Sequence, residues 1–192
     1  MKRTIGVSIL VFAINAFVIS GVIAGVEPSP FQPQINQLYA SENILNSIDH
    51  VVGKTMDNPP IEAQPSVNLD GALNKLDAAN ERVTSVSGFI TSIYEEVMGT
   101  EPSPFRSDIV PALEAVEQAA QNIVIAIDSY LPPAGVPFEF IEALNEVAGS
   151  AQIIVQNTQR YIDGLNCTPL PVDCAGIHDQ ITCNDTCGSC IW

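Results

Sequence analysis

Apolar residues recur at alternating spacings of three and four along four segments of this chain. Residues with this spacing stack on one face of an α-helix, so each segment is predicted to be a helix that buries one stripe. The predicted stripes are Leu38, Leu45, Ile48 and Val52; Leu69, Leu73, Leu76, Asn80, Val83, Ser87, Ile90, Tyr94 and Val97; Ile109, Leu113, Val116, Ala120, Ile123, Ile127 and Tyr130; and Ile141, Leu144, Ala148, Ala151, Val155, Thr158, Ile162 and Leu165. No segment shows the strict alternation that is typical of a strand.

Residues that favour helix ends flank these segments. Gly53 and Gly99 are predicted to close the first and second helices, because glycine adopts the left-handed conformation that ends many helices. Ser107 is a candidate N-cap for the third helix, and Pro137 is expected to open the fourth. The second helix, predicted over 68–98, would be about 46 Å long at 1.5 Å per residue.

An internal repeat organises the helices into two units. The sequence Glu-Pro-Ser-Pro-Phe occurs at 27–31 and again at 101–105, and each copy precedes a periodic segment, a double proline and a second periodic segment. The predicted units span about 27–99 and 101–165, and each is a helical hairpin. Since neither hairpin can bury its stripes alone, we expect an all-α fold, an up-down four-helix bundle over residues 25–165.

The first 24 residues resemble a secretory signal peptide. Lys2 and Arg3 form a basic start, an apolar run follows from Ile5, and the small residues before Gly25 predict cleavage after Ala24. A retained membrane anchor is the alternative, because about 20 apolar residues can span a bilayer. Cleavage predicts a secreted, extracellular protein without stable membrane insertion.

The net charge argues against anionic partners. Without Lys2 and Arg3 the chain holds five basic and 22 acidic residues, a net charge of −17. Nucleic acids and anionic membranes are bound through lysine and arginine, so neither is expected as a partner. The acidity itself favours solubility.

Polar residues in the periodic segments offer little chemistry. Asn80, Ser87 and Thr158 could line a ligand site between helices, or could fix the helix register. The carboxylate pairs (Glu95 and Glu96, Glu114 and Glu117, Glu142 and Glu146) lack the histidine three residues away that metal-binding bundles use, and His50 stands alone near a predicted helix end. We therefore expect no catalytic residue, no cofactor and no enzyme activity.

All five cysteines fall in a tail over 166–192, a short irregular segment without apolar periodicity: Cys167, Cys174, Cys183, Cys187 and Cys190. In an exported chain, clustered cysteines predict disulfides. The competing chemistries are a zinc site that would also use His178, an iron–sulfur cluster and a redox pair. We expect disulfides and no bound metal.

The end of this tail, with Cys183, Thr186, Cys187, Gly188 and Cys190, resembles the last residues of ShKT-type modules, which often finish C-x-x-T-C-G-x-C. The resemblance covers eight residues and implies an extracellular, disulfide-bonded segment. ShKT modules have six cysteines and are longer. Channel blocking is not implied, because no lysine or arginine follows Arg160 to enter a cation pore.

An odd cysteine remains after two bridges. It could join two chains as a disulfide-linked homodimer, or remain a buried or capped thiol. Asn166 and Asn184 each begin a sequence that permits N-linked glycosylation in a eukaryotic host.

Two functional hypotheses follow. The first is a secreted, non-enzymatic binding or surface-interaction protein, whose partner is an apolar small molecule held between the helices, or an extracellular surface or protein. The second is a structural or coat protein that assembles through an intermolecular disulfide.

Overall fold

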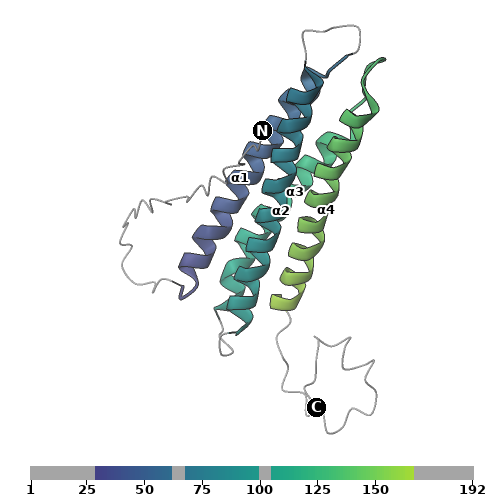
Figure 1. The fold of residues 1–192 in the computed structure, drawn as a ribbon. Helices are drawn as coiled ribbons and strands as arrows, with labels where there is room; N and C mark the ends of the chain where they lie inside the picture. The colour runs from purple at the N-terminus through teal and green to yellow at the C-terminus, as the bar shows by residue number, and fades with distance from the viewer. Residues whose placement is uncertain (1–28, 62–67, 100–104, 167–192) are drawn as a thin grey trace, which may run out of the picture.

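The computed structural model describes residues 29–61, 68–99 and 105–166. These ranges form four α-helices and one short 3-10 helix, without a strand: α1 (Gln32–Asp57), α2 (Leu69–Gly99), η1 (Arg106–Ile109), α3 (Val110–Asp128) and α4 (Phe138–Asn166). The predicted all-α bundle is confirmed (Figure 1). None of the helices in these ranges has the length and apolar content needed to cross a bilayer.

The helices alternate in direction, so that α1 and α3 point one way and α2 and α4 the other (Figure 1). Around the bundle the order is α1, α3, α4, α2, and each helix packs on its two neighbours in this ring. Helices α2 and α3 therefore lie on a diagonal, although they follow each other in the chain. Each hairpin packs on the other through parallel pairs, α1 on α3 and α2 on α4.

Hydrogen bonds between α2 and α4 fix the register of one parallel pair. Ser150 Oγ donates to Asn80 Oδ1 over 2.6 Å, and the hydroxyls of Thr91 and Tyr161 lie 2.9 Å apart. In each pair the two residues are 70 positions apart in the sequence. A constant offset along two helices is the signature of parallel alignment.

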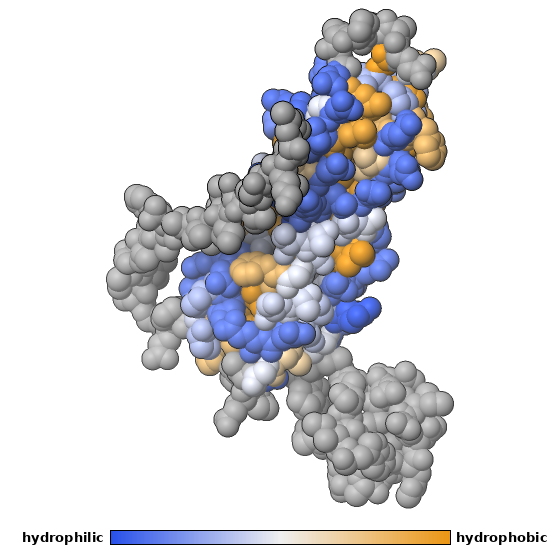
Figure 2. All heavy atoms as spheres, viewed as in Figure 1, coloured by the Kyte–Doolittle hydropathy of each residue, from blue (hydrophilic) through white to orange (hydrophobic). Residues whose placement is uncertain are grey.

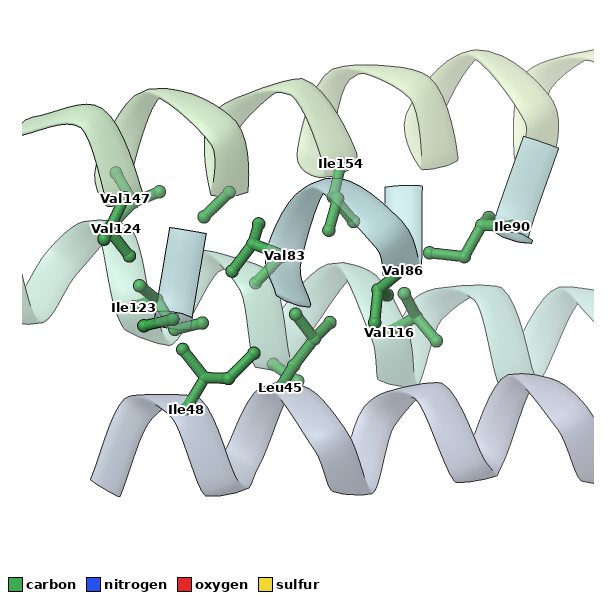
Figure 3. Close-up of a cluster of buried hydrophobic side chains, with 14 of the residues drawn as sticks. Leu45, Ile48, Val83, Val86, Ile90, Val116, Ile123, Val124, Val147 and Ile154 are labelled. Atoms are coloured by element: carbon green, nitrogen blue, oxygen red, sulfur yellow. The ribbon is translucent and has the colours of Figure 1, made fainter. Parts of the chain in front are cut away.

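Aliphatic side chains from all four helices meet along the axis of the bundle. Leu45 from α1, Val83 from α2, Ile123 from α3 and Ile154 from α4 point toward one another in Figure 3 and are at most 1% exposed. They belong to one continuous cluster of buried side chains. Burial of apolar surface on this scale is the main contribution that stabilises a bundle of this size.

The predicted stripes of α1 and α3 are confirmed apart from the half-buried Tyr130, whereas those of α2 and α4 need correction. In α2, Leu76, Val83, Ile90 and Val97 are buried as predicted. The other half of the stripe lies one residue earlier than predicted and consists of Ala72, Ala79, Val86 and Ile93. In α4 the corresponding buried row is Phe140, Val147, Ile154 and Tyr161. The predicted positions of these two rows, including Asn80 and Ser87, are half-buried, except Ile162, which is buried as predicted. Both rows are compatible with the spacing, and in α2 the buried row is the more apolar of the two.

Three predicted helix ends differ from the structure. Gly53 lies inside α1, which continues to Asp57 and still buries the side chain of Thr55 after the glycine. Ser107 belongs to η1, and α3 starts at Val110 without a side-chain cap. Helix α4 begins at Phe138, one residue after Pro137, whereas Gly99 does end α2 as predicted.

Candidate functional site

Most of the predicted site residues lie outside the described ranges. These are the five cysteines (Cys167, Cys174, Cys183, Cys187 and Cys190), His178 and Asn184. Asn166 is the last residue of α4. His50 is exposed on α1.

The polar residues of the predicted stripes have structural partners. Asn80 accepts its hydrogen bond from Ser150 at the α2–α4 contact. Thr158 is fully buried, and its hydroxyl donates to the carbonyl of Ile154 in the previous turn over 2.7 Å. The carbonyl of Ser87 accepts from the Thr91 hydroxyl. The Asn80–Ser150 bond joins two helices and favours a role of Asn80 in helix register, whereas the other two bonds lie within single helices.

Carboxylates gather where α3 and α4 adjoin. Burial raises the pKa of Glu117, and the neighbouring Glu114 and Asp163 raise it further. Among the described residues, no group of three or more His, Cys, Asp or Glu side chains is arranged to hold a metal ion. The cluster therefore places like charges close together at the contact between the two helices.

We predict that Glu117→Gln stabilises the protein at neutral pH. A carboxyl whose pKa is higher in the folded than in the unfolded state stabilises the fold below the unfolded value, and that contribution is lost as pH rises through the folded value. The substitution should raise the midpoint of urea unfolding at pH 7. This gain should disappear below about pH 4, where both states are protonated.

The exposed Glu81 on α2 supplies the control for this prediction. Glu81→Gln removes the same charge without entering the cluster, so its effect should be smaller at pH 7. Equal gains from both substitutions would show that net charge, and not the cluster, limits stability.

Two tyrosines connect the ends of α2 and α4. The rings of Tyr94 and Tyr161 are stacked, with centroids 4.0 Å apart and planes inclined by 11°. Desolvation raises the pKa of Tyr94, and Tyr161 adds to the rise while Arg106 opposes it. A Cβ atom at Gly164 would lie 2.6 Å from the Tyr94 hydroxyl oxygen, so α4 needs glycine there to make room for this ring.

Two glycine-to-alanine substitutions in α4 should therefore act in opposite directions. Gly149 has no atom within 4 Å of an added Cβ, so Gly149→Ala should stabilise by about 0.5–1 kcal/mol through helix propensity. Gly164→Ala should destabilise by about 1 kcal/mol, because Tyr94 must leave its stacked position. Thermal unfolding of the two variants checks the signs, and stabilisation by Gly164→Ala would contradict the close approach.

The loop between α3 and α4, together with the first residue of α4, presents the most exposed large apolar side chains of the described chain. Leu131 is 89% and Phe138 is 73% exposed. No charged residue occurs between Asp128 and Glu139. We call the segment 131–138 the loop tip. In Figure 2, orange residues gather at the end of the bundle where the two hairpin loops lie.

The loop tip has a defined backbone. The Val136 N–H donates to the carbonyl of Pro133 over 3.4 Å, and Gly135 has φ +87°, which together fit a type II turn. Ile61 from the other hairpin loop lies beside Gly135. Beneath the tip, Tyr130 packs edge-on against Phe140, with ring centroids 6.5 Å apart. The tip is thus held on the bundle while Leu131 and Phe138 face outward.

A shallow groove runs along the seam between α1 and α2, which share less contact than the other neighbouring helices. It has a volume of about 200 Å³, and its apolar lining comes from Ile48, Val51, Ala78 and Ala79. Lys75 and Arg82 border it from α2. Neither cation forms a hydrogen bond or ion pair with another described residue.

Comparison with protein-family models, curated proteins and solved structures finds no match for this sequence. The function of the loop tip and the groove is therefore inferred from their geometry and charge alone.

Sequence reasoning missed both surfaces. The loop tip had a signal, a run of ten residues without charge between two helices (129–138). The groove had a weaker one, two cations seven residues apart in an acidic chain. Periodicity identifies the buried stripe of a helix, but it does not show which exposed residues border a seam.

Proposed function

We propose that this protein is a secreted, non-enzymatic interaction protein that binds an apolar surface of an extracellular protein through its loop tip. The exposure of Leu131 and Phe138, 89% and 73%, carries this proposal. The bundle serves as the scaffold that presents the tip.

The chemistry of the tip supports a binding role. Large apolar side chains that cluster on a surface often mark an interaction site. Prolines restrict the backbone of the tip, so little conformational entropy is lost on binding. An aromatic anchor such as Phe138 can contribute much of the binding energy when a partner buries it.

The packed interior favours contact at the surface over an apolar ligand held between the helices. The longest side chains along the axis (Leu38, Leu45, Leu113 and Ile123) are fully buried or nearly so. A ligand that binds only the folded state raises its stability, by about 2.7 kcal/mol at 100 times the dissociation constant. We therefore expect added fatty acid to leave the melting temperature unchanged.

Site-specific photo-crosslinking tests the proposal. A photoreactive phenylalanine analogue at Leu131 or Phe138, in protein secreted by its natural host, should capture a discrete protein partner. The same analogue at Tyr39, an exposed aromatic residue on α1, is the matched control. Excess unlabelled wild-type protein should suppress the adduct, whereas Leu131→Ser with Phe138→Ser should not.

Two outcomes would contradict the proposal. Capture at Tyr39 as efficient as at the tip would show that the adducts arise without a specific surface. Equal competition by the double-serine protein would show that Leu131 and Phe138 contribute nothing to binding.

A further inference from the structure

Four exposed residues of α2 form a row beside α1. Lys75, Arg82, Phe89 and Glu96 are spaced seven apart, which places them on one side of the helix, and all are exposed. Lys75 and Arg82 border the α1–α2 groove, and Glu96 accepts a 2.9 Å hydrogen bond from Gln34 of α1. We call these four residues the α2 row.

A second row lies on α4. Glu139, Glu146, Ile153 and Arg160 share the spacing of seven and are also exposed. None of their side chains forms a hydrogen bond or ion pair with another described residue. We call these four residues the α4 row.

The two rows are complementary in one orientation. Aligned in parallel, they pair Lys75 with Glu139, Arg82 with Glu146, Phe89 with Ile153 and Glu96 with Arg160. The rise between successive positions is about 10.5 Å on both helices, so the four pairs can form together.

The reverse orientation is disfavoured. Antiparallel alignment places Lys75 against Arg160 and Glu96 against Glu139. Like charges at both ends repel, so the rows favour the parallel direction.

These rows cannot meet within one molecule. Helices α2 and α4 of the same chain already contact each other through different faces, as the Asn80–Ser150 and Thr91–Tyr161 pairs show. The α2 row instead borders α1 on another side of α2. The α4 row must therefore find its complement on another chain.

We propose that the α2 row of one copy binds the α4 row of a second copy, with the two helices parallel. The contact removes two large exposed apolar side chains from water, Phe89 at 42% and Ile153 at 52% exposure. Every copy carries both rows, so the contact is head-to-tail and leaves one free row at each end of an assembly. It uses no cysteine, and it goes beyond the binding role of the loop tip.

The high net charge is compatible with this contact. At physiological ionic strength, charges are screened over about 8 Å. Paired side chains in the contact lie within that distance, whereas most of the acidic surface of a second copy lies beyond it. The local attraction can therefore exceed the overall repulsion.

Charge reversal on each row tests the proposal in the full-length secreted protein. One variant carries Lys75→Glu and Arg82→Glu, and the other carries Glu139→Lys and Glu146→Lys. Wild-type protein should self-associate with rising concentration in sedimentation velocity, and each variant alone should remain monomeric. Mixing the two should restore association, because each reversed row then meets a complementary one.

A charge-matched control distinguishes the rows from net charge. Asp57→Lys with Asp128→Lys changes exposed residues outside both rows and alters the charge by the same amount as the α4 variant. This control should associate at least as well as wild type. Circular dichroism confirms that every variant keeps its helices. Monomeric wild-type protein at all concentrations, or variants that stay associated alone, or a mixture that stays monomeric, would each overturn the proposal.

Discussion

Replacement of Leu45 by alanine is expected to lower the free energy of unfolding by about 2–5 kcal/mol. Leu45 has no exposed surface and points into the axis of the bundle, where side chains from the other three helices surround it (Figure 3). Its truncation removes apolar contacts and leaves a cavity that close-packed neighbours fill only in part. Urea unfolding followed by circular dichroism measures the loss.

The preceding residue provides the control. Ile44 has the same number of carbon atoms but is 43% exposed, so Ile44→Ala should cost less than about 1 kcal/mol. Similar losses at both positions would mean that α1 does not direct the predicted face into the core.

The second large effect is expected from overpacking at Ala120. This alanine on α3 is fully buried, and α3 and α4 share the most extensive helix–helix contact of the bundle. Ala120→Leu adds three carbon atoms where no space exists, which should destabilise by about 1–3 kcal/mol. The same unfolding measurement applies.

Ala78 is the matched position for this prediction, because it is helical but exposed at the α1–α2 groove. Ala78→Leu should change stability by no more than about 0.5 kcal/mol. A neutral Ala120→Leu variant would show that the packing around Ala120 is loose enough to accept a larger side chain.

Helix content and the bundle were predictable because burial imposes periodicity directly on the sequence. The stripes of Leu45 and Ile123 follow it, apart from Tyr130. The buried face of α2 was harder to predict, because two rows of residues have the right spacing to complete the stripe of Leu76 and Val83. The two rows differ in composition, as Ala79 against Asn80 shows. The sequence carries that difference, but spacing alone does not.

The arrangement of the helices was harder to predict from the sequence than the helices themselves. The repeat at 27–31 and 101–105 predicts two hairpins, yet it does not say which helices become neighbours. Packing of α1 on α3 places α2 and α3 on a diagonal, and this choice depends on side-chain shape across the whole core. The loop tip and the groove were not predicted for a related reason. The positions of Leu131 and Lys75 on the folded surface, and not their residue types, make them candidates for binding.

The parallel pairing of equivalent helices also has an evolutionary consequence. One hairpin is related to the next by a sideways displacement that keeps each helix direction, which is how units succeed one another in helical repeat arrays. A two-fold pairing would close after two units, whereas a displacement can be repeated. Duplication of a unit of about 74 residues would therefore lengthen the stack and keep the existing interface. The fold thus has the size of a four-helix bundle and the unit-to-unit geometry of a helical repeat array.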